Sequence, residues 1–231
     1  HNYYPPPKKP FVFNLASNNE EIAYLSIKHV KNSIRLCSKI GSKIFAFHAG
    51  FRIDPSVKEL GNKLNKSNLI CKDQAIDTFT KRVSMLSREA EKLNINLMIE
   101  NNVISKTNID HFQENPLLFT NPHEISEIMN LVPENIGFLL DVGHLKVSSQ
   151  SLGFNLSQAH KDLYNKISAY HLSDNDGITD QNKPVTDDSW FWNDLKSNVS
   201  FLTLEIYNSS IDELVSQKEL VENKLNNKNQ F

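Results

Sequence analysis

The chain contains few cysteines and no long apolar run, which excludes several classes of protein. Its 231 residues include only two cysteines, Cys37 and Cys71. These two form neither a disulfide framework nor a metal-ligand spacing, so they favour a reducing compartment. No apolar run approaches the roughly 20 residues of a membrane span, and no basic-then-apolar leader is visible. We therefore expect no membrane partner and a cytoplasmic location.

The chain also has almost no excess of charge. Its 25 Lys and Arg residues oppose 27 Asp and Glu residues, which gives a formal net charge of −2. Duplex DNA binding usually rests on a basic surface, so the charge weighs against DNA as a partner. At this length one domain can bury a full hydrophobic core. We predict a single domain over residues 1–231.

Five short apolar runs each end in a histidine or an acidic residue. A short apolar run bounded by turn signals predicts a buried parallel strand. The residues that end the five runs are His48, Glu100, Asp141, His171 and Glu205, and His144 follows soon after Asp141. The scarce glycines are informative as well, because three of only seven, Gly50, Gly143 and Gly177, lie near these residues. Glycine lets the backbone turn sharply or approach a ligand closely.

Amphipathic segments alternate with the predicted strands. The predicted strands cover residues 43–48, 95–100, 136–141, 167–171 and 201–207. The first predicted helix is capped by Ser17, Asn18 or Asn19 and ends at Gly41. The other predicted helices cover residues 73–93, 121–131, 155–165, 190–196 and 211–225. Residues 50–72, 101–119, 145–154 and 172–189 are predicted loops. Alternating strands and helices indicate a parallel sheet with helices outside, and functional residues at the ends of many strands are typical of a (β/α)₈ TIM barrel.

The residue types at the strand ends suit a divalent metal. Carboxylates and neutral imidazoles together bind Zn²⁺, Mn²⁺, Co²⁺ and related cations. Such a metal can polarise a carbonyl or activate a bound water. Glu100 and Glu205 would then suit proton transfer next to a carbonyl, so we predict them as the catalytic pair. The other histidines lie on predicted helices or polar loops and are expected to face solvent: His29, His111, His123 and His160.

Several short motifs stand in a characteristic order along the chain. They are His1-Asn2-Tyr3 with Asn14-Leu15-Ala16-Ser17, then His48-Ala49-Gly50, Glu100-Asn101, Asp141-Val142-Gly143-His144, His171-Leu172-Ser173-Asp174 and Glu205. In these motifs the chain resembles the xylose-isomerase-like TIM barrels, which include sugar phosphate isomerases and epimerases and the endonuclease IV type of AP endonuclease (AP endonuclease family 2). The resemblance implies that His1 ends the third barrel strand. We therefore expect a barrel that lacks its first two βα units in this chain, or a homodimer that covers the gap.

The resemblance also implies which residues bind metal and substrate. One divalent metal, Zn, Mn, Co or Mg, would be held by Glu100, Asp141, His171 and Glu205. His144 would bind substrate or a second metal, and the second-metal candidates are His1, His48, His144 and Asp180. Lys146 and Lys183 lie in loops that could reach a substrate phosphate.

One departure from the endonuclease branch bears on the reaction. That branch has an Asp-x-His after the seventh strand, which helps to complete a three-zinc site. Here Asp180-Gln181-Asn182 stands at that place, and a carboxamide is a poor zinc ligand. The sequence therefore favours a metal-dependent isomerase or epimerase acting on a sugar or sugar phosphate. The alternatives are an endonuclease IV-like metal-dependent phosphodiesterase, favoured by the three histidines His1, His48 and His144, and a non-catalytic sugar-binding barrel.

Overall fold

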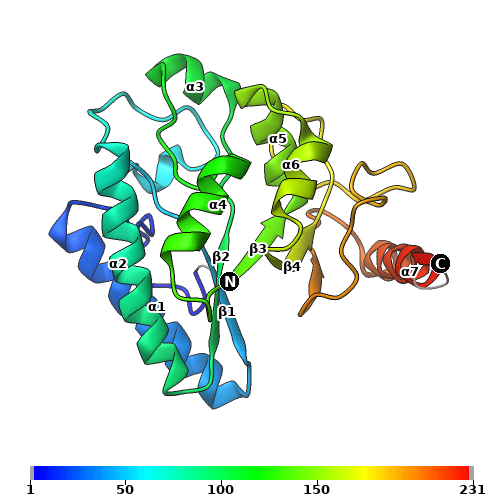
Figure 1. Cartoon of the computed structure of the whole chain (residues 1–231), viewed down its shortest axis with the longest axis horizontal. Coiled ribbons are helices and arrows are strands. Elements are labelled where there is room, and N and C mark those ends of the chain that lie inside the picture. Colours follow the sequence, from blue (N-terminus) through cyan, green and yellow to red (C-terminus); the bar gives the residue numbers. More distant parts are fainter. Residues whose placement is uncertain (1–2, 229–231) are drawn as a thin grey trace.

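A curved parallel sheet organises the chain in the computed structural model, which describes residues 3–228 (Figure 1). Within these residues the sheet has five strands in the order β1-β2-β3-β4-β5, all parallel. The strands are β1 (Ile44–His48), β2 (Asn96–Glu100), β3 (Gly137–Asp141), β4 (Ile167–Leu172) and β5 (Leu202–Leu204). Because neighbours in the sheet are also consecutive in the chain, this is the strand order of a TIM barrel. The partial barrel confirms the predicted fold class.

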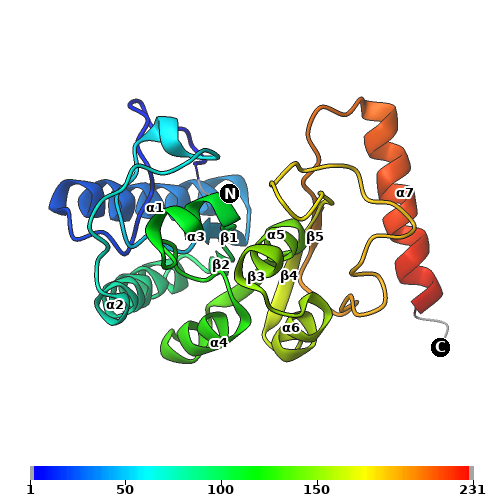
Figure 2. The same ribbon diagram turned by 90° about the horizontal axis from the view of Figure 1, so that it is seen from above.

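Helices cover the outer side of the sheet. In Figure 2, α1 (Glu20–Ile40), α2 (Lys72–Glu91), α4 (Pro122–Leu131) and α6 (Leu156–Leu163) follow one another along this side, and α7 (Ile211–Lys228) lies beyond β5. The first helix begins where the sequence predicts, because the Asn19 side chain accepts hydrogen bonds from the amides of Glu21 and Ile22. It ends at Gly41, which has a φ of 78°. A short 3₁₀ helix, η1 (Val57–Glu59), lies in the predicted loop 50–72.

The alternation of side chains along each strand separates the core from the site. Outward-facing side chains such as Phe47, Ile99 and Phe138 are buried against the helices, where each contributes roughly 1.5–3 kcal/mol to stability. The inward-facing layer consists of the smaller cluster Ala46, Met98, Leu139 and Ala169. Two positions further along the same strands stand His48, Glu100, Asp141 and His171. Since side chains repeat with a period of two, these residues form the next inward layer, at the C-terminal end of the strands.

Two helices lie where the sequence predicted loops. Residues 145–152 of the predicted loop 145–154 belong to α5 (Val142–Leu152), whose N-terminus is capped by Asp141. This helix shows no amphipathic pattern because 8 of its 11 residues are buried. A second helix, α3 (Lys106–Phe112), lies inside the predicted loop 101–119 and is capped by the Ser105 side chain. Its 7 residues are too few to show a clear period.

Two other predicted elements are wrong in type or length. Residues 190–196 form no helix: residues 190–194 form turns, in which Trp192 N donates to Ser189 O and Asp194 N donates to Phe191 O. The indole of Trp192 donates to Thr186 O at 2.7 Å, which ties this segment back on itself. The last strand covers only Leu202–Leu204 rather than residues 201–207, because Tyr207 N bonds to Asn182 O and not to β4.

Two of the four histidines expected to face solvent are buried. His29 is 6% exposed and packs among the rings of Tyr3, Phe11 and Phe13. His160 is fully buried and stacks on Tyr170 with ring centroids 5.8 Å apart. Both take part in core packing, which a helix position in the sequence does not reveal. Among the described residues, no helix combines the length and the apolar character needed to cross a bilayer.

Candidate metal centre

The imidazole of His171 is surrounded by three carboxylates from other strand ends. Its Nδ1 atom lies 2.7 Å from Glu205 Oε2, 3.1 Å from Glu100 Oε1 and 3.8 Å from Asp141 Oδ2. One ligand atom from each of these four residues lies within 4.8 Å of all the others. The structure therefore brings together the four residues that the sequence indicated for the first metal.

The burial of the carboxylates in this four-residue cluster favours a bound cation. Glu100 and Asp141 are both 0% exposed. Within the described part of the chain, Asp141 Oδ2 is buried and accepts no hydrogen bond. A buried carboxylate oxygen is costly to leave in this state unless it coordinates a cation or lies against one. Three carboxylates and one imidazole are also a donor set that divalent metals accept.

Burial and neighbouring charges shift the pKa values of Asp141 and His171. Burial raises the pKa of Asp141 to about 6, and the attraction of nearby His144 only partly offsets this effect. Burial lowers the pKa of His171, but its hydrogen bonds to Glu100 and Glu205 outweigh burial and raise the pKa to about 10. His171 therefore carries a proton between the carboxylates at neutral pH when no other cation is present. A divalent cation would replace that proton as the positive charge between the carboxylates.

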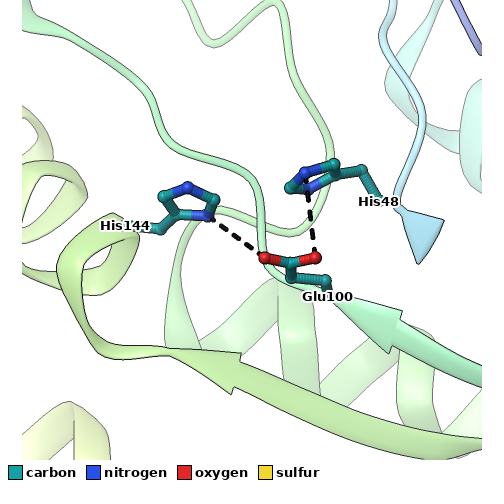
Figure 3. Close-up of side chains that lie close together, drawn as sticks. All are labelled: His48, Glu100 and His144. Atoms are coloured by element: carbon teal, nitrogen blue, oxygen red, sulfur yellow. Dashed lines mark ion pairs between the residues drawn. The ribbon is translucent and has the colours of Figure 1, made fainter. Parts of the chain in front are cut away.

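A second group of possible ligands adjoins the first through Glu100. Figure 3 shows the imidazoles of His48 and His144 on either side of the Glu100 carboxylate. His48 Nε2 lies 3.7 Å from Glu100 Oε2, and His144 Nδ1 lies 3.9 Å from Glu100 Oε1. Asp180 also joins this group, with its Oδ2 atom 3.2 Å from His144 Nε2. Three of the four second-metal candidates thus lie together, and the fourth, His1, lies outside the described residues.

Asn101, which the sequence reasoning missed as a functional residue, holds two of these side chains in place. Its side chain accepts a hydrogen bond from Asp141 N at 2.7 Å and donates one to Asp141 O at 3.0 Å. Its main-chain carbonyl lies 2.8 Å from His144 Nδ1. Because that carbonyl can only accept, Nδ1 of His144 carries a proton, and Nε2 is the nitrogen directed toward Asp180. The only signal in the sequence was a carboxamide directly after a predicted ligand.

Two of the three glycines that the sequence indicated near the site, Gly50 and Gly143, permit close approach. A Cβ atom on Gly143 would lie 2.7 Å from Ser173 Oγ and 3.2 Å from Asp141 Oδ1. A Cβ atom on Gly50 would lie 2.5 Å from the Cβ of Ala16. The distances of 2.7 Å and 2.5 Å are shorter than side chains tolerate. These positions therefore keep the segments after β1 and β3 closely packed beside the ligands.

The two lysines predicted to bind substrate have different surroundings. Lys146 Nζ lies 2.6 Å from Asp174 Oδ1 and donates to Asn175 O at 2.5 Å. Lys183 exchanges main-chain hydrogen bonds with Asp174, and its side chain is exposed. Lys146 therefore anchors the base of the loop that carries Asp180. Binding of a phosphate by either lysine stays a prediction.

Residues 1–207 match the protein family described as xylose isomerase-like TIM barrel. The chain belongs to this family. An uncharacterized protein from Methanocaldococcus jannaschii is 26% identical over 208 residues, which cover 87% of this chain and 69% of the relative. That relative carries no functional description of its own. Membership in the family agrees with the resemblance in the strand-end motifs.

Two solved structures show how far the xylose isomerase-like architecture extends along the chain. The crystal structure of a D-tagatose 3-epimerase-like protein superposes with a TM-score of 0.71 at 20% identity, covering 96% of this chain and 76% of the other. The apo form of 3-keto-D-glucoside 4-epimerase from E. coli gives a TM-score of 0.62 at 11% identity, covering 91% of this chain and 76% of the other. At these identities the similarity establishes the fold.

Proposed function

We propose that this chain is a divalent-metal-dependent isomerase or epimerase that acts on a sugar or sugar phosphate by proton transfer next to a carbonyl. The observation that carries the proposal is the convergence of Glu100, Asp141, His171 and Glu205 at the C-terminal end of the sheet. Membership in the xylose isomerase-like family and the epimerase names of similar structures support it. The metal would be Zn, Mn, Co or Mg, all of which accept such ligands.

The four residues would hold the metal, which when bound would supply a positive charge to polarise the substrate carbonyl. The side chain of Glu205 is 22% exposed, whereas that of Glu100 is fully buried. Glu205 is therefore the more exposed member of the catalytic pair, and we assign to it the removal of a proton from the carbon next to the carbonyl. Glu100 returns a proton on the other face. The Nδ1 atom of His144 is held by Asn101, and its Nε2 atom lies 3.2 Å from Asp180 Oδ2, so His144 would bind a substrate hydroxyl through Nε2 in competition with Asp180.

Deuterium exchange tests this proposal without knowledge of the full substrate range. Metal-loaded protein is incubated in D₂O with a panel of ketoses and ketose phosphates, and proton NMR follows exchange at the carbon next to the carbonyl. Glu100→Gln and Glu205→Gln should each reduce exchange by at least 100-fold, within the range general acid–base catalysis contributes. Glu89→Gln, at an exposed position on α2, is the matched control. The proposal fails if both site variants bind metal and exchange protons like the wild type.

The second group of ligands favours one other function, a metal-dependent phosphodiesterase of the AP-endonuclease kind. His48 and His144 adjoin Glu100, Asp180 adjoins His144, and a single-metal epimerase does not need all of them. Cleavage of a duplex that contains an abasic site, abolished by a chelator, would establish this function. Absence of duplex binding at low salt would remove it. A third reading, a non-catalytic sugar-binding barrel, requires that Mn²⁺, Co²⁺ and Zn²⁺ give no thermal stabilisation.

A further inference from the structure

Glu205 is the least confined of the four ligands. It follows the three-residue β5, at the edge of the sheet described here. Its side chain is 22% exposed, compared with 8% for His171 and 0% for Glu100 and Asp141. A ligand at a short edge strand needs additional contacts to keep a fixed orientation.

Those contacts come from Asn182 and Tyr207. Glu205 N donates to Leu172 O at 3.0 Å, and Asn182 Nδ2 donates to Glu205 O at 3.1 Å. Asn182 O in turn accepts from Tyr207 N at 3.0 Å. Asn182, in the middle of this connection, is 4% exposed. The residue at which the endonuclease branch has a histidine ligand thus ties the loop of Asp180 to the end of β5.

The two carboxylate oxygens of Glu205 face different groups. Oε2 lies 2.7 Å from His171 Nδ1, inside the ligand cluster. Oε1 accepts a hydrogen bond from the Tyr207 hydroxyl at 3.3 Å, on the outer side. A phenol with an ordinary pKa near 10 is a donor at neutral pH. The carboxylate is therefore held between an imidazole on one oxygen and a phenol on the other.

We infer that Tyr207 is a positioning residue that holds Glu205 so that only Oε2 faces the metal cluster. This inference rests on the proposed metal site. Hydrogen bonds to the outer atoms of ligands fix the orientation of those ligands, and losing one typically costs 10- to 100-fold in metal affinity. The ring of Tyr207 is 59% exposed, so its packing contributes little, and the hydroxyl is the functional part of the side chain.

Removing the hydroxyl alone tests this role. Tyr207→Phe keeps the ring, and Zn²⁺ affinity is measured by competition with a chromophoric chelator. We expect affinity to fall about 10-fold, the lower end of the range for such contacts. Tyr24→Phe is the matched control, because Tyr24 is 60% exposed on α1. The d–d absorption of the Co²⁺-loaded protein is the second readout, and it should change in Tyr207→Phe but not in Tyr24→Phe, since a merely structural role would leave the coordination unchanged.

The possible outcomes separate this inference from the proposed function. If the wild type binds neither Zn²⁺ nor Co²⁺, the proposed function fails and the role of Tyr207 fails with it. If the wild type binds metal and Tyr207→Phe matches Tyr24→Phe in both affinity and spectrum, only the role of Tyr207 is overturned. A lower affinity together with a changed spectrum supports it.

Discussion

His171 directs its Nδ1 atom at Glu205 Oε2 over 2.7 Å, joining the ends of β4 and β5 across the top of the sheet. The same nitrogen faces Glu100 from β2 and Asp141 from β3. One imidazole nitrogen therefore faces carboxylates from the ends of three other strands. In the proposed function this atom and the three carboxylates are the metal ligands.

Asp141→Asn should abolish most of the stabilisation that metal gives. The substitution keeps the shape of the side chain but removes the charge of a buried ligand. At a metal concentration of 100 times Kd, a single site stabilises the wild type by about 2.7 kcal/mol, and the variant should lose most of this gain. Thermal unfolding with and without Zn²⁺ measures it. Equal stabilisation of Asp141→Asn and wild type would exclude Asp141 as a ligand.

Gly143→Ala should weaken metal binding through a steric effect. The new methyl group would lie 2.7 Å from Ser173 Oγ and 3.2 Å from Asp141 Oδ1, so the ligand or the start of α5 must move. Overpacking of this kind costs about 1–3 kcal/mol of folding stability. The control is Gly143→Ala combined with Ser173→Gly, which removes the nearest clash and should restore part of both losses. Denaturant unfolding and Zn²⁺ titration measure the two effects, and wild-type values for Gly143→Ala would contradict the packing described here.

Tyr170→Phe should destabilise the fold without touching the metal ligands. The Tyr170 hydroxyl is buried, lies 2.9 Å from His160 Nε2 and accepts from Lys196 N at 3.1 Å. Losing a buried hydrogen-bond partner costs about 1–3 kcal/mol. Tyr164→Phe, at a residue that is 40% exposed, should change stability by no more than about 0.5 kcal/mol. If the two variants unfold at the same denaturant concentration, the hydrogen bond between His160 and Tyr170 contributes nothing to folding stability.

The stabilising effect of Asp174 should disappear in acid. Burial raises the pKa of this carboxyl, but hydrogen bonds from Lys146, Ser189 and Asn175 outweigh burial and hold the pKa below its ordinary value. An acid whose pKa is lowered in the folded state stabilises the fold above its unfolded pKa, and this contribution is lost as pH falls through the folded pKa. The difference in unfolding free energy between wild type and Asp174→Asn should therefore have its largest value at pH 6 and decrease below about pH 4.

The control for this pH dependence is Asp188→Asn, at an exposed position of the same loop. Its difference from the wild type should stay near zero over the whole pH range. A difference for Asp174→Asn that is constant between neutral and acidic pH would mean that the carboxyl is not engaged by Lys146 in solution.

The strand ends could be predicted from the sequence because their signal is local. An apolar run that stops at His48, Glu100 or Asp141 specifies both a buried strand and a polar group at its end, and the structure places all of these on one side of the sheet. The long helices α1 and α2 could be predicted for a similar reason, since each buries one face and exposes the other. Parallel pairing then brings the ends together.

The missed features depend on contacts between distant residues. The helix α5 is buried on most sides, so its sequence lacks the period of a surface helix. The burial of His160 follows from its stacking on Tyr170, which no local pattern predicts. In the same way, the contact from Tyr207 to Glu205 depends on the short β5 and on Asn182. Local periodicity reports strands and amphipathic helices, but it does not report which polar side chains meet.

An anomalous difference map from a Zn²⁺- or Mn²⁺-soaked crystal would locate the proposed metal. We expect one strong peak bounded by Glu100, Asp141, His171 and Glu205, the four residues whose ligand atoms lie within 4.8 Å of one another. Elemental analysis of the same protein should give one metal per chain. Two or three peaks that engage His48 and His144 would contradict the single-metal isomerase and favour the phosphodiesterase, and a map with no peak among the four residues would contradict the metal centre itself.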